Sequence, residues 1–146
     1  MSKRIVIMGS TGSIGVSAID VVRSLGPDYE VIGLAARSRW EDLLKQCGLV
    51  HPRAVAIADP SCASRLRSRL NGTELLTGPE GLVELASRPG SDFLVAAIVG
   101  AAGLASTVAA VRAGKAVGLA NKETLVVAGS IVVPLARETG ARLLPI

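Results

Sequence analysis

Short apolar runs alternate along the chain with segments in which apolar residues recur at helical spacing. Runs rich in valine and isoleucine favour strands, whereas the longer periodic segments favour amphipathic helices. The expected strands are residues 4–8, 29–34, 54–57, 93–99, 116–119 and 142–144. The expected helices are residues 14–25, 40–47, 61–70, 79–87, 104–113 and 122–139. Strands that alternate with helices pair in parallel through right-handed crossovers, so the pattern predicts an α/β fold with a doubly wound parallel sheet.

Proline and glycine residues mark several of the expected helix ends. The sequence DPS at residues 59–61 is a typical helix start, and Pro79 suits the first turn of the next helix. Three glycines are each placed to end a helix, namely Gly48, Gly114 and Gly140.

The composition suits such a sheet. Hydrophobic residues make up 49% of the 146 residues and aromatic residues only 2%, so Ala, Val, Leu and Ile must build the core. Parallel strands that are buried on both faces have this composition. The length fits one core, and no internal repeat or long linker interrupts the pattern, so we expect one domain over residues 1–146.

Charge and hydropathy bear on the partners and on the compartment. The formal net charge is +4 at pH 7, but the basic residues are scattered and are not interleaved with aromatic residues, so we expect no nucleic-acid partner. No apolar stretch reaches the roughly 18 residues of a membrane span, and the N-terminus leads straight into a strand, so we expect a cytoplasmic protein with no membrane partner. Cys47 and Cys62 lack the spacing of a metal site and are expected to be reduced thiols.

The most concentrated motif is GSTGSIG at residues 9–15, between the first expected strand and the first expected helix. Its glycines, Gly9, Gly12 and Gly15, form a variant of the dinucleotide fingerprint G-x-G-x-x-G. A turn with little side-chain bulk before a bare helix start lets backbone N–H groups approach a pyrophosphate, which makes Gly9 a candidate cofactor contact. A purely structural glycine turn is the alternative, and a P-loop is excluded because no Gly-Lys-Ser/Thr follows.

The end of the second expected strand indicates which dinucleotide is bound. NAD-binding domains carry an acidic residue there, about 20 residues past the glycines, which hydrogen-bonds the adenosine ribose. This chain has Arg37, Ser38 and Arg39 at that place. Guanidinium groups match a 2'-phosphate, so the cluster favours NADP(H) over NAD(H). The alternative is that both arginines are solvated loop charges.

A second motif, GLANKETLVVAG at residues 118–129, follows the fifth expected strand. One interpretation is a helix start, with Asn121 as the cap and Glu123 complementing the helix dipole. Lys122 does not fit that interpretation, because a cation at the positive end of a helix is unfavourable unless an anion or a reacting oxygen holds it there. Both interpretations stay open.

Two further features have ordinary structural explanations. The small residues of AAIVGAAGL, residues 96–104, either let a cofactor ring lie against backbone or serve helix packing. His51 is the only histidine, and next to Pro52 it is most simply a loop residue before a strand rather than a general base.

Together these motifs resemble the N-terminal NADPH-binding domain of the 1-deoxy-D-xylulose 5-phosphate reductoisomerase family. The resemblance rests on GSTGSIG with DVV in the first helix, AAIVGAAGL followed by Thr107 and AVRAGK, LANKETLV, and the terminal LLP, in order over essentially the whole chain. It implies a Rossmann-type NADP-binding domain. In this family the enzyme rearranges 1-deoxy-D-xylulose 5-phosphate and reduces the aldehyde with NADPH to 2-C-methyl-D-erythritol 4-phosphate, a step of isoprenoid precursor biosynthesis by the methylerythritol phosphate pathway. It uses a divalent metal such as Mg, Mn or Co.

The resemblance also implies roles for individual residues. The implied cofactor-binding residues are Thr11, Gly12, Ser13 and Ile14 for the pyrophosphate, and Asn121 and Glu123 for the nicotinamide half. Lys122 would contact the phosphorylated sugar substrate. The family commonly has Gly-Lys-Asn where this chain has Arg37, Ser38 and Arg39, so a cation is kept at this place. The resemblance implies a homodimer for the full-length enzyme.

The chain ends in the apolar sequence RLLPI at residues 142–146. The family continues from LLP as LLPVDSEH into metal and substrate ligands, so we expect a truncated piece whose metal ligands lie beyond Ile146. Such a piece is expected to be inactive alone. Two rival functions stay open: another NADP-dependent dehydrogenase domain, such as a semialdehyde dehydrogenase with a nucleophilic cysteine, and a non-catalytic NADP-binding sensor.

Overall fold

Short apolar segments form the strands of one parallel sheet in the computed structural model, which describes residues 2–120 and 122–146. The strands are β1 (Lys3–Met8), β2 (Tyr29–Ala36), β3 (Ala54–Ile57), β4 (Glu74–Thr77), β5 (Phe93–Ala96), β6 (Ala116–Leu119) and β7 (Arg142–Pro145). The helices are α1 (Ser13–Ser24), α2 (Trp40–Val50), α3 (Ala63–Arg67), α4 (Gly78–Ser87), α5 (Gly100–Arg112) and α6 (Lys122–Thr139), and the 3-10 turn η1 (Pro60–Cys62) precedes α3.

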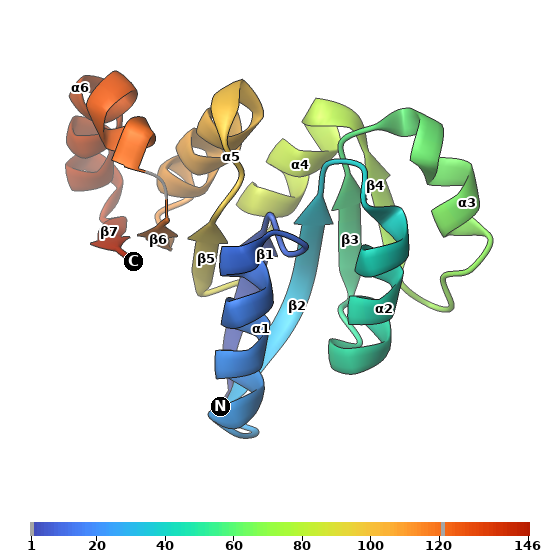
Figure 1. Cartoon of the computed structure of the whole chain (residues 1–146). Helices are drawn as coiled ribbons and strands as arrows, with labels where there is room; N and C mark the ends of the chain where they lie inside the picture. The colour runs from blue at the N-terminus through green and yellow to red at the C-terminus, as the bar shows by residue number, and fades with distance from the viewer. Residues whose placement is uncertain (1, 121) are drawn as a thin grey trace.

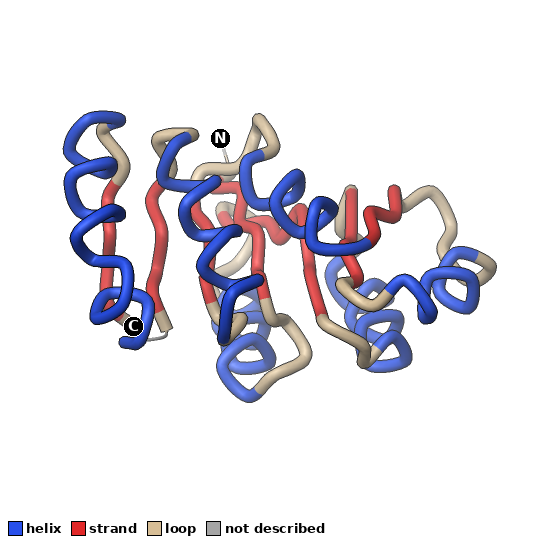
Figure 2. The backbone as a smooth tube through the Cα atoms, turned by 90° about the horizontal axis from the view of Figure 1, so that it is seen from above, coloured by secondary structure: helices blue, strands red, loops and turns tan. Residues whose placement is uncertain are grey.

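The strand order is β4-β3-β2-β1-β5-β6-β7, and all of these pairs are parallel. The chain builds outward from β1 to β4 and then returns, so that β5 pairs with the other side of β1. Helices cover both faces of the sheet, as Figures 1 and 2 show from two directions. The predicted doubly wound arrangement is confirmed, and the reversal between β1 and β5 is the place where such sheets open a ligand crevice.

Alternate residues of the strands face two different helical layers. In β1, Ile5 and Ile7 pack with apolar residues of α1, α2 and α3, whereas Val6 and Met8 pack with those of α4, α5 and α6. Successive side chains of a strand point to opposite faces, so a strand that is buried on both sides is apolar at every position. Aliphatic residues dominate both layers, as the composition predicts.

The prediction missed β4 and misplaced the boundary between β5 and α5. In β4 only Leu75 and Leu76 are apolar, a signal too short for a strand to be recognised from sequence. β5 ends at Ala96 and α5 begins at Gly100, whereas we expected the strand to reach residue 99 and the helix to begin at 104. Val99 lies beyond the end of β5, but its backbone is extended, with φ −85° and ψ 157°. An apolar residue in this conformation continues the sequence pattern of the strand although it is not paired in the sheet.

Two helices also end at other residues than the sequence pattern predicts. Gly48 lies inside α2, which continues to Val50 and ends at His51 in the left-handed region, with φ 50°. The helix expected over residues 61–70 is shorter, because η1 and α3 together end at Arg67. The predicted start is right: Asp59 caps η1 by accepting a hydrogen bond from the Ser61 N–H.

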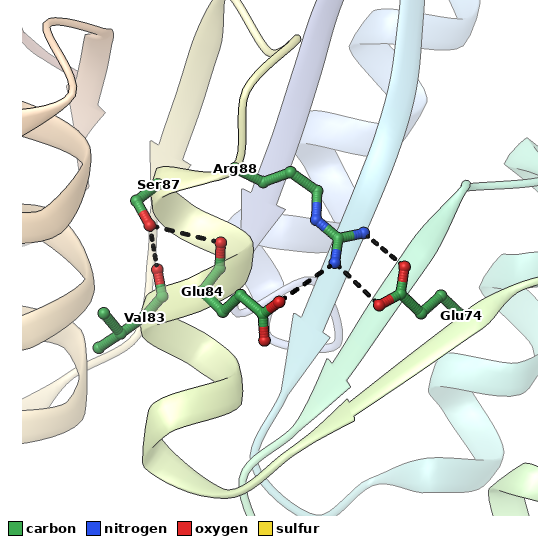
Figure 3. A network of polar contacts seen from close by, with 5 residues as sticks. All are labelled: Glu74, Val83, Glu84, Ser87 and Arg88. Carbon is green, nitrogen blue, oxygen red and sulfur yellow. Dashed lines mark hydrogen bonds and ion pairs between the residues drawn. The ribbon is translucent and has the colours of Figure 1, made fainter.

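Charged residues at the amino ends of the strands are paired. Arg88 donates to both carboxylate oxygens of Glu74 at 2.9 Å each, and its Nη2 lies 3.6 Å from Glu84 (Figure 3). This hydrogen-bonded pair lowers the pKa of Glu74 and raises that of Arg88. Lys115 is buried, its Nζ donates to the Arg88 carbonyl and to the Ser91 hydroxyl, and burial lowers its pKa. These contacts link Arg88, the residue that follows α4, to the start of β4 and to the segment that precedes β6.

Candidate functional site

The glycine turn after β1 lies at the sheet reversal. Both the Gly9 N–H and the Ser10 N–H donate to the Ala35 carbonyl of β2, at 2.8 and 2.9 Å. Gly9 has φ +86°, and a Cβ there would lie 2.7 Å from the Ala97 carbonyl oxygen, in the loop after β5. Only glycine satisfies both conditions, so the turn is pressed between β2 and the loop after β5.

The start of α1 is held close to this turn and is left open toward solvent. A Cβ on Gly15 would lie 2.5 Å from the Ser10 Cα, so the helix packs directly on the turn. A Cβ on Gly12 would meet only the Gly9 carbonyl oxygen, at an ordinary 3.6 Å. Gly12 makes no side-chain cap, and the first turn of α1 contains no acidic residue. The Gly12 N–H donates to the Gly9 carbonyl at 3.2 Å, so the N–H groups that remain available to an anion are those of the first turn of α1.

The residues predicted to follow Gly9 at this site are accessible. Thr11 is half-buried, and Gly12, Ser13 and Ile14 are exposed. All four lie at the carboxyl edge of the sheet, where the chain leaves β1 and enters α1. The structure thus brings them together, with their backbones at the helix start.

The loop after β5 contributes a second bare helix start. The Ala97 N–H donates to the Met8 carbonyl at 2.9 Å, which joins this loop to the end of β1. Val99 precedes α5 without a side-chain cap, and no acidic residue lies in the first turn. A Cβ on Gly103 would overlap the Ile98 carbonyl oxygen, so helix packing accounts for this small residue.

Arg37, Ser38 and Arg39 follow β2 and are exposed. Within residues 2–120 and 122–146, no ion pair involves either arginine. Ser38 and Arg39 line a cavity of about 320 Å³ together with residues of the first turns of α2, namely Trp40, Glu41, Asp42 and Lys45. The guanidinium groups are thus exposed to a ligand, and the carboxylates of Glu41 and Asp42 line the same cavity as Arg39.

The neighbouring strand end carries an acid that is already engaged. Asp59 accepts hydrogen bonds from the Ser61 hydroxyl at 2.7 Å and from the Ser61 N–H at 3.0 Å, and these bonds lower its pKa. Its N–H donates to the Arg37 carbonyl. The Asp59 carboxylate therefore serves as a helix cap next to the arginine cluster.

The motif after β6 lies at the same edge of the sheet. The Ala120 N–H donates to the Ala96 carbonyl at 3.1 Å, which joins the end of β6 to the end of β5. Lys122 is the first residue of α6, and Glu123 lies exposed in its first turn. Asn121, predicted to contact the nicotinamide half, lies outside the described residues.

Gln46 is a further residue of this site, and the sequence motifs did not predict it. Its side chain is buried, and its Nε2 donates to the Ser10 carbonyl of the glycine turn at 2.7 Å. The available signal is that α2 places Gln46 on its apolar face, between Leu43 and Cys47. A polar side chain on a buried helix face must find a partner, but the sequence does not say which.

Other candidate residues lie away from this edge. His51 ends α2 and lines a cavity of about 580 Å³ at the amino side of the sheet, together with Cys47 and Arg53. Burial raises the pKa of the Cys47 thiol to about 11, which makes Cys47 a poor nucleophile. Among the residues that the structure describes, no three His, Cys, Asp or Glu side chains cluster as metal ligands. No helix in the described ranges is long and apolar enough to cross a membrane.

The sheet order, the reversal and the glycine turn define an α/β domain of the Rossmann type. The chain belongs to the 1-deoxy-D-xylulose 5-phosphate reductoisomerase family, whose model matches residues 5–129. It aligns with the N-terminal part of that family's members.

Individual relatives agree with this membership. The reductoisomerase of Anaeromyxobacter dehalogenans is 48% identical over 145 residues, which are 99% of this chain and 37% of that protein. The structure of the Zymomonas mobilis enzyme in complex with NADPH is 40% identical, has a TM-score of 0.95 and is covered over 38% of its length. A reductoisomerase structure with magnesium is 41% identical, with a TM-score of 0.93 over 99% of this chain and 37% of that one. The chain thus spans somewhat more than a third of these relatives.

Proposed function

We propose that this chain is the NADPH-binding domain, over residues 1–146, of a 1-deoxy-D-xylulose 5-phosphate reductoisomerase. The observation that carries the proposal is the start of α1, which lacks a side-chain cap and an acidic residue, beside two exposed arginines that form no ion pair within the described residues. A relative of the same fold, 40% identical, is described as a complex with NADPH.

The pyrophosphate fits the glycine turn. The backbone around Thr11, Gly12, Ser13 and Ile14 presents the N–H groups of the helix start, where the helix dipole favours negative charge. Gly9 shapes the turn, and Gly12 leaves free the space that a ligand needs for close approach. Oxygen atoms of a diphosphate are the acceptors that such a site selects.

The 2'-phosphate of NADPH fits the arginine cluster. Arg37 and Arg39 supply planar guanidinium forks and Ser38 a hydroxyl, all of which donate to phosphate oxygens. The Asp59 carboxylate next to this cluster is held by Ser61 and turned into a cap. This arrangement selects NADPH over NADH, since NADH offers no phosphate to the arginines.

The nicotinamide half lies toward the ends of β5 and β6. In our proposal Asn121 and Glu123 contact that half of the cofactor, and Lys122 reaches the phosphorylated sugar substrate. NADPH supplies the hydride that reduces the rearranged aldehyde. The residues of this chain bind and orient the cofactor, while Lys122 at a helix start gains stability from an anionic or oxygen-rich partner.

We place the remaining parts of the reaction in the regions of the relatives that this chain does not cover. In this proposal the parent enzyme holds a divalent metal, Mg, Mn or Co, with ligands in those regions, and forms a homodimer in the cytoplasm. Its reaction would convert 1-deoxy-D-xylulose 5-phosphate to 2-C-methyl-D-erythritol 4-phosphate for isoprenoid precursor biosynthesis.

The test measures binding and turnover on the same chain. Calorimetric titration should show binding of NADPH and much weaker binding of NADH. Incubation with 1-deoxy-D-xylulose 5-phosphate, NADPH and magnesium or manganese should produce no substrate-dependent loss of NADPH absorbance. Absence of NADPH binding contradicts the proposed domain function, and turnover by the chain alone contradicts the assignment of the metal ligands to other regions.

A full-length relative tests the assignment of Lys122. Replacing the matching lysine by alanine should strongly reduce turnover or substrate affinity and change NADPH affinity little. If steady-state kinetics are unchanged, the helix-capping interpretation of this motif is right.

A further inference from the structure

Ser10 is the fully buried residue of the glycine turn. Its N–H donates to the Ala35 carbonyl of β2 at 2.9 Å, and its carbonyl accepts from Gln46 Nε2 of α2 at 2.7 Å. Two elements that lie far from Ser10 in sequence therefore hold this residue, β2 at its N–H group and α2 at its carbonyl.

The direction of the Ser10 carbonyl also sets the direction of the next N–H group. The carbonyl of Ser10 and the N–H of Thr11 belong to one planar trans peptide, so they point in opposite directions. Because Gln46 holds the carbonyl inside the protein, the Thr11 N–H is directed away from α2. No hydrogen bond from the Thr11 N–H occurs within the described ranges.

Gln46 and Ser10 also retain unused hydrogen-bonding capacity. The Ser10 hydroxyl and Gln46 Oε1 are buried without a partner among the described residues, although one is a donor and the other an acceptor. A buried side chain that keeps an unpaired oxygen is poorly explained by stability alone, because an apolar residue of the same length avoids that cost.

From this geometry we infer that Gln46 is a positioning residue for the cofactor, which orients the Ser10–Thr11 peptide so that the Thr11 N–H faces the pyrophosphate. The inference rests on the proposed NADPH-binding function. Gln46 itself does not touch the cofactor. It acts from beneath the turn, through the Ser10 carbonyl.

The first experiment removes the hydrogen bond and keeps the shape. Gln46→Met should weaken binding of NADP⁺ and NADPH by about five- to tenfold, as expected for a lost hydrogen bond of ordinary strength. Leu43→Ala is the matched control, because Leu43 is fully buried on the same helix and packs in the core. That variant should unfold at a lower urea concentration yet bind NADP⁺ as the parent does, when both are measured fully folded.

The second experiment uses pH. In Gln46→Glu a protonated carboxyl group can still donate to the Ser10 carbonyl, whereas an ionised one cannot, and burial raises the pKa of the introduced carboxyl. Its NADP⁺ affinity relative to the parent should be near one at about pH 6 and should fall several-fold at about pH 8.5. A merely structural side chain predicts no such change. This variant also decides the question if Gln46→Met fails to fold.

The outcomes separate the two proposals. If the parent chain binds neither NADP⁺ nor NADPH, the proposed function fails. If the parent binds and Gln46→Met binds equally well, or if Leu43→Ala loses as much affinity as Gln46→Met, the positioning role of Gln46 is wrong while the proposed function stands. A flat affinity ratio for Gln46→Glu between the two pH values likewise overturns the positioning role.

Discussion

The two edges of the sheet differ in how they use polar groups. At the amino edge, Arg88 pairs with two carboxylates, and the buried side chain of Lys115 donates hydrogen bonds to a carbonyl and a hydroxyl. At the carboxyl edge, α1 and α5 begin without side-chain caps or acids, and Arg37 and Arg39 form none of the ion pairs found in the described chain.

This difference indicates that the polar groups of the amino edge serve stability, whereas those near the reversal of the carboxyl edge are left for binding. A polar group that is paired within the protein is lost to a ligand, and a helix start that carries its own acid repels an anion. The two edges share the same strands and the same core, so the distinction comes from the loops alone. In open α/β sheets the ligand binds at the carboxyl edge, at the reversal of strand order. The two helices that follow β1 and β5 there, α1 and α5, begin without acids, whereas α2, α4 and α6 each carry an acidic residue in the first turn.

The largest expected effect is on cofactor choice at the carboxyl edge. Replacing both Arg37 and Arg39 by Ala should weaken NADPH binding by about 2–4 kcal/mol, because charge-assisted bonds to the 2'-phosphate contribute about 1.5–3 kcal/mol each. NADH binding should hardly change. Calorimetry on both dinucleotides checks this, with Arg53→Ala at the amino edge as the control. An equal loss for NADPH and NADH would show that these arginines do not contact the 2'-phosphate.

The next effect separates packing from ligand approach within the glycine turn. Gly15→Ala should lower the free energy of unfolding by about 2–3 kcal/mol, since the new methyl group meets backbone of Ser10 that cannot move aside. Gly12→Ala should change it by less than about 1 kcal/mol, because the new methyl group has room. Gly12→Ala should nevertheless weaken NADPH binding.

Urea unfolding and NADPH titration of both variants make this comparison. Equal stability losses would contradict the packing difference between the two glycines. Unchanged NADPH affinity in Gly12→Ala would mean that no ligand approaches the backbone at that residue.

The smallest effect lies at the amino edge and depends on pH. Because Arg88 lowers the pKa of Glu74 in the folded state, the pair stabilises the protein above the pKa of the unfolded state and loses this contribution as pH falls through the folded pKa. Glu74→Gln should therefore melt below the parent at about pH 7 and close to it at about pH 3. Glu84→Gln, with a single 3.6 Å contact, should show a smaller difference. A pH-independent difference for Glu74→Gln would show that the ion pair is not its cause.

The fold was accessible from sequence where the local pattern was long or strongly punctuated. The strands at residues 54–57 and 116–119 and the helix at 122–139 lie where they were predicted. β4 was missed because it is a short strand with two apolar residues, and its place in the sheet comes from pairing with β3. The start of α5 was missed because small residues carry little periodicity.

Part of the candidate site could likewise be predicted from local sequence. The motif GSTGSIG predicts the glycine turn, and the two arginines directly after β2 predict the cationic cluster. The sequence also determined the α/β class, because strand and helix periodicities are properties of neighbouring residues.

Only the tertiary structure decided which groups meet. It pressed Gly9 against Ala97, explained Gly103 by its contact with Ile98, and placed Gln46 beneath Ser10. These contacts join residues 36 or more positions apart, or depend on how a helix packs on a loop, so no local pattern encodes them. The tertiary structure also decided which charged side chains are paired. A charge at the amino edge and a charge at the carboxyl edge look alike in sequence until the fold gives one of them a partner.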